Sequence, residues 1–258
     1  MRTPPIIRLV VRNFVSSLDP LTIIVRFGQP ALTIVVLGTM FTTLITSTSV
    51  TGNESYTAFL VPGMVAFQMI TGGVLSGNLF WLDRRWAMVE QIFSGPFLRS
   101  EYLAGMVLTT LLFSLVGVGV MIIVAVPFIG VVHLSLLGIG VVLLTVALGS
   151  MFFAGLLIAL GTKLRSANIY FTIQSFLQLF VIFLSTVYYP ITDKTPGVLK
   201  WVFYGNPLTY AANTIRDAFN GTLGGADAIS LAVLGGLAAV SFIAAVWGFR
   251  RLDLGPIQ

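Results

Sequence analysis

The stretch from Tyr102 to Thr162 contains no Asp, Glu, Lys or Arg, and it constrains the fold more than any other feature of the chain. As one α-helix it would measure about 90 Å, roughly three times the hydrocarbon thickness of a bilayer. The stretch must therefore double back, and Pro127, Gly130 and His133 mark the expected turn. We predict two membrane-spanning helices here, Tyr102–Ile129 and Leu134–Thr162.

The composition extends this argument to the whole chain of 258 residues. Hydrophobic residues make up 57% of it and charged residues 9%, with a mean hydropathy of +0.98. A soluble domain carries roughly 25% charged residues, so a soluble globular domain and a disordered chain are both excluded. We expect an all-α polytopic membrane protein with one transmembrane domain over residues 1–258.

Charged residues bound the other expected spans, because a charge marks where the chain leaves the lipid. These spans are Phe27–Ile45, Thr57–Leu82, Ile169–Val187 and Ile229–Phe249, which gives six transmembrane helices in all. Arg26 lies just outside the first, where its long side chain can reach the interface.

The Lys and Arg residues predict the orientation of these spans in the cell membrane. The loops on one side hold about eleven of the 14 basic residues and those on the other side about three, so both termini should be cytoplasmic. Basic residues scattered among spans report orientation and contact with lipid headgroups, and we expect no nucleic-acid partner.

Several kinds of chemistry are excluded. The chain has no cysteine and one histidine, and none of its lysines follows a glycine as a phosphate-binding loop requires. The expected spans hold almost no ionisable group, which argues against ion-coupled transport and hydrolysis within the membrane. We expect no catalytic residue, no metal site and no cofactor in this chain, so another polypeptide must supply energy for any transport.

The first twenty residues have the pattern of an amphipathic helix on the membrane surface. Ile7, Val10, Phe14 and Leu18 recur at helical spacing, and Asp19-Pro20 ends the pattern. The alternative is that the first span simply begins early.

Residues 83–100 form a polar cytoplasmic loop in this topology. Trp86, Val89, Ile92 and Phe93 fall on one helical stripe, and Ser94-Gly95-Pro96 ends the helix. Such a helix is suited to docking a partner, although an interfacial loop without a partner is the alternative.

Residues 188–227 are too long for an ordinary loop between spans. Helix-start pairs at Thr195-Pro196 and Asn206-Pro207, with Gly221 as a stop, predict short helices over 196–204 and 207–220. They would be external and reentrant-like, and would cover the outer end of a path. The alternative is that they lie on the surface and have no role in a path.

Three segments resemble the membrane subunit of type-2 ATP-binding-cassette exporters. They are Tyr56–Gly63, then Met88–Pro96 with Arg99–Gly105, and finally Asn206–Tyr210 with Arg216. Gly95 departs from the larger residue that many members carry before Pro96. The resemblance implies a homodimer or pseudo-dimer with a path at its interface. It also implies two separately encoded ATPase subunits, which bind ATP and Mg. Each would receive the coupling helix of the family, which the segment Met88–Pro96 resembles.

Candidate residues follow from this resemblance and from the polar residues within the spans. Those expected to contact the ATPase are Arg84, Arg85, Trp86, Val89, Glu90, Ile92 and Phe93. Those expected to form an external gate are Asn206, Pro207, Tyr210 and Arg216. Those expected to line the path or the dimer interface are Gln68, Asn78, Gln174 and Gln178. The last two lie four residues apart on one helix face, although hydrogen bonding between helices is an equal alternative.

The expected function is that of a permease subunit that moves a hydrophobic or amphipathic molecule, such as a drug or lipid, outward. Export of a polysaccharide or lipid-linked glycan is the alternative. A membrane anchor or sensor that recruits an ATPase without transport is a more remote one. Gly73 and Gly77 form a small-x-x-x-small pattern that predicts close helix packing.

Overall fold

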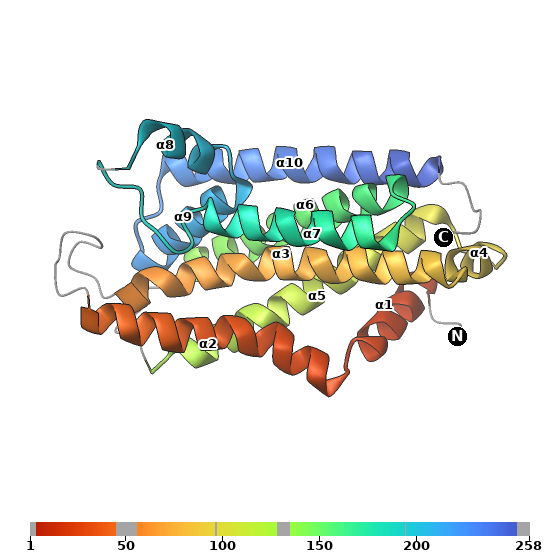
Figure 1. The fold of residues 1–258 in the computed structure, drawn as a ribbon, viewed down its shortest axis with the longest axis horizontal. Coiled ribbons are helices and arrows are strands. Elements are labelled where there is room, and N and C mark those ends of the chain that lie inside the picture. The colour runs from red at the N-terminus through yellow and green to blue at the C-terminus, as the bar shows by residue number, and fades with distance from the viewer. Residues whose placement is uncertain (1–3, 45–55, 96, 128–134, 194, 252–258) are drawn as a thin grey trace.

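The computed structural model describes residues 4–44, 56–95, 97–127, 135–193 and 195–251, and these ranges form ten α-helices and no strand (Figure 1). Five helices are long and apolar enough to cross a membrane. They are α2 (Pro20–Leu44), α3 (Tyr56–Arg85), α5 (Arg99–Ala125), α6 (Leu136–Lys163) and α10 (Gly225–Arg250). The expectation of an all-α, multi-pass membrane protein is confirmed to this extent.

A further apolar helix, α7 (Ala167–Phe183), has 17 residues and is shorter than these five. The predicted span Ile169–Val187 extends past its end, because the chain leaves the helix after Phe183. The uncharged stretch doubles back as predicted, from α5 into α6. Most of its predicted turn, including Gly130 and His133, lies outside the described residues.

Four helices are shorter: α1 (Pro5–Ser16), α4 (Met88–Phe93), α8 (Gly197–Tyr204) and α9 (Pro207–Asn220). α8 and α9 lie within the ranges predicted for the two short helices. Local capping explains the agreement at α9, where the Asn206 side chain accepts a hydrogen bond from the Leu208 N–H and Gly221 ends the helix in the left-handed region.

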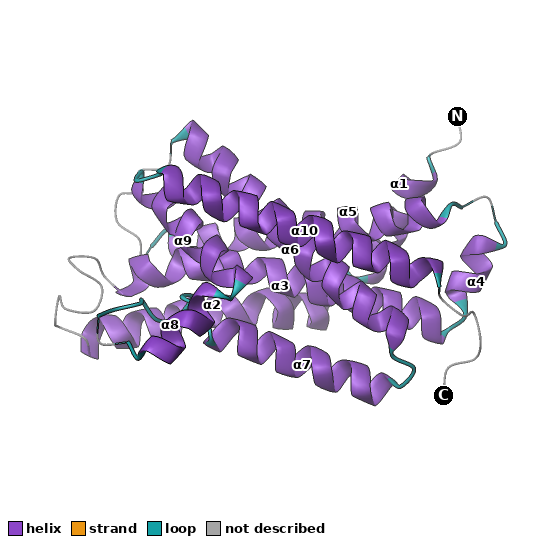
Figure 2. Cartoon of the chain, turned by 90° about the horizontal axis from the view of Figure 1, so that it is seen from above, coloured by secondary structure: helices purple, strands orange, loops and turns teal. Residues whose placement is uncertain are grey.

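The helices form an elongated bundle around α3, whose residues are mostly buried (Figures 1 and 2). α2, α5, α6 and α9 pack against α3, and α10 packs against α6. α4 lies at one end of the bundle and α8 at the other, and we call these the α4 end and the α8 end (Figure 1).

The predicted close packing at Gly73 and Gly77 is confirmed between α3 and its neighbours. A Cβ atom at Gly73 would lie 2.4 Å from Cβ of Phe153 in α6, and one at Gly77 would lie 2.3 Å from the Tyr170 hydroxyl oxygen in α7. Neither position has room for a side chain, so the glycines allow these helices to approach α3 closely.

The predicted start of the first span at Phe27 is wrong. α2 begins at Pro20, where the Asp19 carboxylate accepts a hydrogen bond from the Thr22 N–H at 3.0 Å. α1 is a separate helix, so the first span does not absorb it. Arg26 therefore lies inside an apolar helix that is long enough to cross a membrane. The predicted start was too late because each charged residue, Arg26 included, was taken to mark the end of a span.

Candidate functional site

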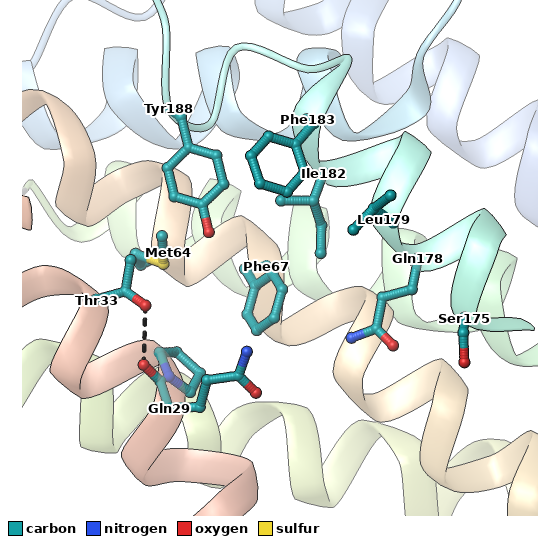
Figure 3. A pocket seen from close by; sticks show the side chains of 11 residues that line it. Gln29, Thr33, Met64, Phe67, Ser175, Gln178, Leu179, Ile182, Phe183 and Tyr188 are labelled. Carbon is teal, nitrogen blue, oxygen red and sulfur yellow. Dashed lines mark hydrogen bonds between the residues drawn. The ribbon is translucent and has the colours of Figure 1, made fainter.

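Two cavities lie between α2 and α7, with α3 behind them (Figure 3). Two cavities of about 370 Å³ each adjoin there and share Gln29, Phe67 and Gln178 as lining residues. We call the combined space the α2–α7 groove. One cavity extends toward the α8 end as far as Tyr188, and the other extends toward the α4 end as far as Thr22.

The groove combines polar side chains with a large apolar surface. Gln29 from α2 and Gln178 from α7 reach toward the space beside Phe67 from opposite sides (Figure 3). Phe67, Leu179, Ile182 and Phe183 supply the apolar lining. A few polar groups in an otherwise apolar cavity are typical of sites that bind small molecules.

The four predicted path residues lie in different places. Gln178 lines the groove, whereas Gln174 is buried one turn earlier, and its Oε1 atom has no hydrogen-bond partner in the described part of the chain. Gln68 is buried between α3 and α5, close to Gly117. Asn78 is half-buried, and neither it nor Gln68 is among the residues that line the groove.

Sequence reasoning missed Gln29, which faces Gln178 across the groove. The signal in the sequence was a glutamine inside an apolar span, because the polar side chain of Gln29 favours polar surroundings there. The next residue, Pro30, also removes a backbone hydrogen-bond donor from the helix. That α2 and α7 would place these two residues on opposite sides of one groove was not visible in the sequence.

Asn206 joins the end of α7 to the start of α9. Its Nδ2 atom donates to the backbone carbonyls of Val181 and Leu184 at 2.7 Å each, while its Oδ1 atom accepts from the Leu208 N–H at 2.9 Å. The side chain thus satisfies carbonyls at the C-terminal end of one helix and an N–H at the start of another. Pro207 follows as the first residue of α9.

Arg216 connects α9 to two other segments beside the α8 end of the groove. Its NH2 atom donates to the carbonyls of Phe59 and Thr186, at 3.3 and 3.1 Å. Its guanidinium carbon lies 3.9 Å from the centre of the Phe59 ring. Tyr210 donates to the Tyr204 carbonyl at 2.7 Å and so holds the end of α8. The predicted gate residues therefore hold the α7–α8–α9 segment together.

Asp217 lies on α9 next to these contacts. Burial raises the pKa of its carboxyl group, and the nearby Asp227 carboxylate raises it further, while hydrogen bonding from Thr222 opposes the shift. Two neighbouring carboxylates repel when both are ionised, so the ionised form of Asp217 is disfavoured at the junction of α9 and α10.

α4 packs against the bundle through one face. Val89 is buried, and the Phe93 ring lies 5.9 Å from that of Tyr102 and 5.6 Å from that of Phe249. These contacts join α4 to α5 and α10. Val89, Ile92 and Phe93 of the predicted stripe therefore pack against the chain's own core, whereas Trp86 of the same stripe is exposed. Contact of the stripe with a partner stays a prediction.

The outward face of α4 and its approach carry different residues. Arg85, Trp86 and Glu90 are exposed, with Trp86 at 68%. Arg84 is half-buried, and its NH1 atom donates to the carbonyls of Gly161 and Leu164 at 2.6 and 2.8 Å. A cation at the C-terminal end of α6 satisfies carbonyls that the helix leaves unpaired.

An ion pair joins α1 to the α4 end of the bundle. Arg12 pairs with the buried carboxylate of Asp83, which also accepts a hydrogen bond from the Tyr102 hydroxyl at 2.8 Å. Sequence reasoning missed this pair because its members lie 71 positions apart. α1, α3 and α5 are therefore linked beside α4.

Among the residues that the structure describes, no group of three His, Asp or Glu side chains is placed to hold a metal ion.

Comparison with known proteins places this arrangement in a family. Residues 6–220 match the family model described as "ABC-2 type transporter". A protein of Porphyra purpurea named "Putative transport permease ycf38" is 26% identical over 213 residues, and the match covers 79% of this chain and 69% of that protein. The family match covers most of the bundle, from α1 to the end of α9. The chain therefore belongs to the ABC-2 type transporter family, as a permease subunit.

Proposed function

We propose that this chain is the membrane subunit of an ATP-driven exporter that moves a hydrophobic or amphipathic molecule from the cytoplasmic side outward. The observation that carries the proposal is the α2–α7 groove, whose two cavities of about 370 Å³ each combine apolar walls with Gln29 and Gln178. Sites for drug-sized molecules have a similar size and polarity. Two copies of this chain and two separate ATPase subunits, which bind ATP and Mg, make up the transporter.

The second copy covers the groove. Polar side chains that face lipid are costly, so Gln29, Ser175 and Gln178 favour a protein partner over hydrocarbon. The edges of the groove are apolar, with exposed residues such as Leu32 on α2 and Phe180 on α7. A dimer through these edges would enclose a path between two facing grooves, formed by two identical chains or by a related one.

Six spans and a cytoplasmic α4 end complete this topology. α7 would be about 26 Å long at the α-helical rise, close to the hydrocarbon thickness of about 30 Å, so it serves as the sixth span. Arg84, Arg99 and Arg250 gather at the α4 end, where Arg99 donates to carbonyls at the end of α10. By the positive-inside rule that end faces the cytoplasm of the cell, with both termini there.

α4 is the coupling helix in this proposal. Trp86, Glu90 and Arg85 are exposed and would contact the ATPase, Glu90 by pairing with a basic group. Phe93 and Val89 would transmit the movement, since they pack against α5 and α10. Arg84 would pass it to α6 through the carbonyls at its end. Six of the seven residues named for ATPase coupling would thus divide into three that contact the ATPase and three that transmit the movement to the bundle.

α8 and α9 would cover the outer end of the path. Asn206 and Arg216 fix α9 to the end of α7 and to α3, beside the Tyr188 end of the groove. Opening to the outside then requires these contacts to move together or to break. This is the role we assign to Asn206, Pro207, Tyr210 and Arg216 as an external gate.

The test reconstitutes the permease with its ATPase in vesicles and measures ATP-dependent transport together with co-purification. Glu90→Arg should abolish co-purification of the ATPase, whereas the matched control Asp193→Arg, an exposed acid at the α8 end, should retain it. Replacing Gln178 by Leu should reduce transport with the complex intact. A chain that never binds an ATPase would refute the proposal. A complex that hydrolyses ATP but moves neither amphiphiles nor lipid-linked glycans would support the anchor or sensor alternative.

A further inference from the structure

We propose that Arg26 makes the α2–α7 groove selective for amphipathic molecules that carry an anionic group, such as a phosphate or a carboxylate. This inference rests on the proposed export function and names the class of substrate. It follows from a positive charge that borders the groove on an apolar helix long enough to cross a membrane, and that forms no ion pair with the residues that the structure describes.

The side chain of Arg26 is half-buried and lies against α5. Its guanidinium carbon lies 5.6 Å from the centre of the Phe113 ring in α5. Its NH1 atom is buried, and no hydrogen-bond partner reaches it among the described residues. A cation–π contact supplies only part of what water or a carboxylate would give a buried guanidinium.

Other arginines of the bundle show what Arg26 lacks. Arg12 pairs with Asp83. Arg84 donates to carbonyls at the end of α6, and Arg99 does the same at the end of α10. These contacts explain the three as structural residues, whereas a ring face is the contact that the described chain offers Arg26. The missing acceptor is therefore expected from a molecule that enters the groove.

The groove around Arg26 is built to receive such an acceptor. The cavity toward the α4 end is lined by Arg26, by the hydroxyl-bearing Thr22 and Thr71, and by the amides of Gln29 and Gln178. Among the lining residues of both cavities, Arg26 alone carries a formal charge. The potential in this cavity is therefore positive, and hydrogen-bond donors surround it.

The opposite end of the groove suits an apolar body. Phe67, Leu179, Ile182 and Phe183 line the cavity toward the α8 end, next to the amides shared by both cavities. A molecule with its anion at Arg26 and its apolar part between α3 and α7 would match both halves. A cationic amphiphile would meet the same apolar walls but be repelled by Arg26.

The experiment uses the permease–ATPase complex in phosphatidylcholine vesicles and three probes with one alkyl chain: dodecyl phosphate, dodecyl glucoside and dodecyltrimethylammonium. Binding and ATP-driven transport are measured separately for each probe. The variants are Arg26→Gln and Arg26→Lys, with Arg251→Gln as a matched control outside the groove.

We expect Arg26→Gln to weaken binding of dodecyl phosphate by roughly 10- to 100-fold, as loss of a hydrogen bond to a charged group predicts. Glucoside binding should change less than about twofold, since it lacks the ionic contact. Arg26→Lys should retain most of the phosphate binding, and Arg251→Gln should bind all three probes like the wild type.

Two results would overturn the inference. One is that Arg26→Gln weakens binding of all three probes equally or leaves phosphate binding unchanged. The other is that bound dodecyl phosphate is not moved by ATP while the glucoside is, which would show that Arg26 holds a resident lipid headgroup. In either case, ATP-driven transport of the glucoside would still support the proposed export function. Failure of every probe to move in the wild type would instead count against the proposed function.

Discussion

Replacing Asn206 tests how α9 is held against the end of α7. The Asn206 side chain is buried and makes three hydrogen bonds, two as a donor to carbonyls near the end of α7 and one as an acceptor at the start of α9. Asn206→Ser keeps an oxygen that can cap α9 but loses both donated bonds. Asn206→Asp also keeps the cap but turns a negative charge toward the two carbonyl oxygens.

The magnitude follows from these contacts. Each hydrogen bond contributes about 1 kcal/mol, so Asn206→Ser should lower the free energy of unfolding by about 2 kcal/mol. For a chain of this size the midpoint temperature of thermal unfolding falls by roughly 2–4 °C per kcal/mol, so it should fall by about 4–8 °C in this variant. At pH 8 Asn206→Asp should lower the free energy of unfolding by more than Asn206→Ser does, because its buried carboxylate would face carbonyl oxygens and have no hydrogen-bond donor from them.

The pH dependence separates the two variants. The new carboxyl group should have a pKa in the folded state above its value in the unfolded state, since burial and the carbonyls disfavour its charge. The folded state then binds the proton more tightly, so the defect should be smallest at low pH and grow as the pH rises through the folded-state pKa. The Ser variant has no such group, and its defect should stay constant.

The assay is thermal unfolding in lipid nanodiscs at pH 5 and pH 8, together with transport in vesicles. Asn168→Asp is the matched control, because Asn168 is exposed at the start of α7 and its replacement should change stability by less than about 0.5 kcal/mol. If Asn206→Asp unfolds at the wild-type temperature at pH 8, these hydrogen bonds do not hold α9 and the argument fails.

Further predictions address the bundle itself. Gly73→Ala would place a Cβ atom 2.4 Å from a side-chain carbon of α6 and should destabilise the fold by about 1–3 kcal/mol in thermal unfolding. Gly119→Ala, which has open space around it, should be neutral or slightly stabilising, and equal effects of the two would refute the packing argument. Arg12→Gln leaves the Asp83 carboxylate buried without its ion pair and should cost about 3 kcal/mol. Adding Asp83→Asn should recover part of that loss, and a double variant no better than the single one would contradict the pairing. Asp217→Asn should raise stability at neutral pH and lose the advantage in acid, because the raised pKa of Asp217 makes its ionisation unfavourable for folding as the pH rises; unfolding midpoints across pH check this.

The local signals in the sequence were reliable where one short segment decides the structure. The start and end of α9 follow from Asn206-Pro207 and Gly221, which act on backbone groups within a few residues. The reversal between α5 and α6 follows from length alone, because no single helix of that size fits a bilayer. Gly73 and Gly77 likewise marked close packing, although not the helices that meet there.

The sequence predicted only part of the candidate site. Gln178 was predicted to line a path and does line the groove, while Gln29 was missed and Gln68 packs elsewhere. Arg26 was read as a boundary, although a ring of α5 accommodates its guanidinium within the span. The stripe on α4 was identified, but its inward direction was not.

Composition and spacing by themselves determined that this chain is helical, crosses the membrane several times and has short helices before the first span and between later ones. The tertiary structure alone decided which faces meet. In a soluble helix the polar face marks the outside, but a membrane span is apolar on all sides, so its sequence carries little information about which side packs and which faces lipid. The groove between α2 and α7, and the charge that borders it, therefore appear only once helices far apart in the sequence lie side by side.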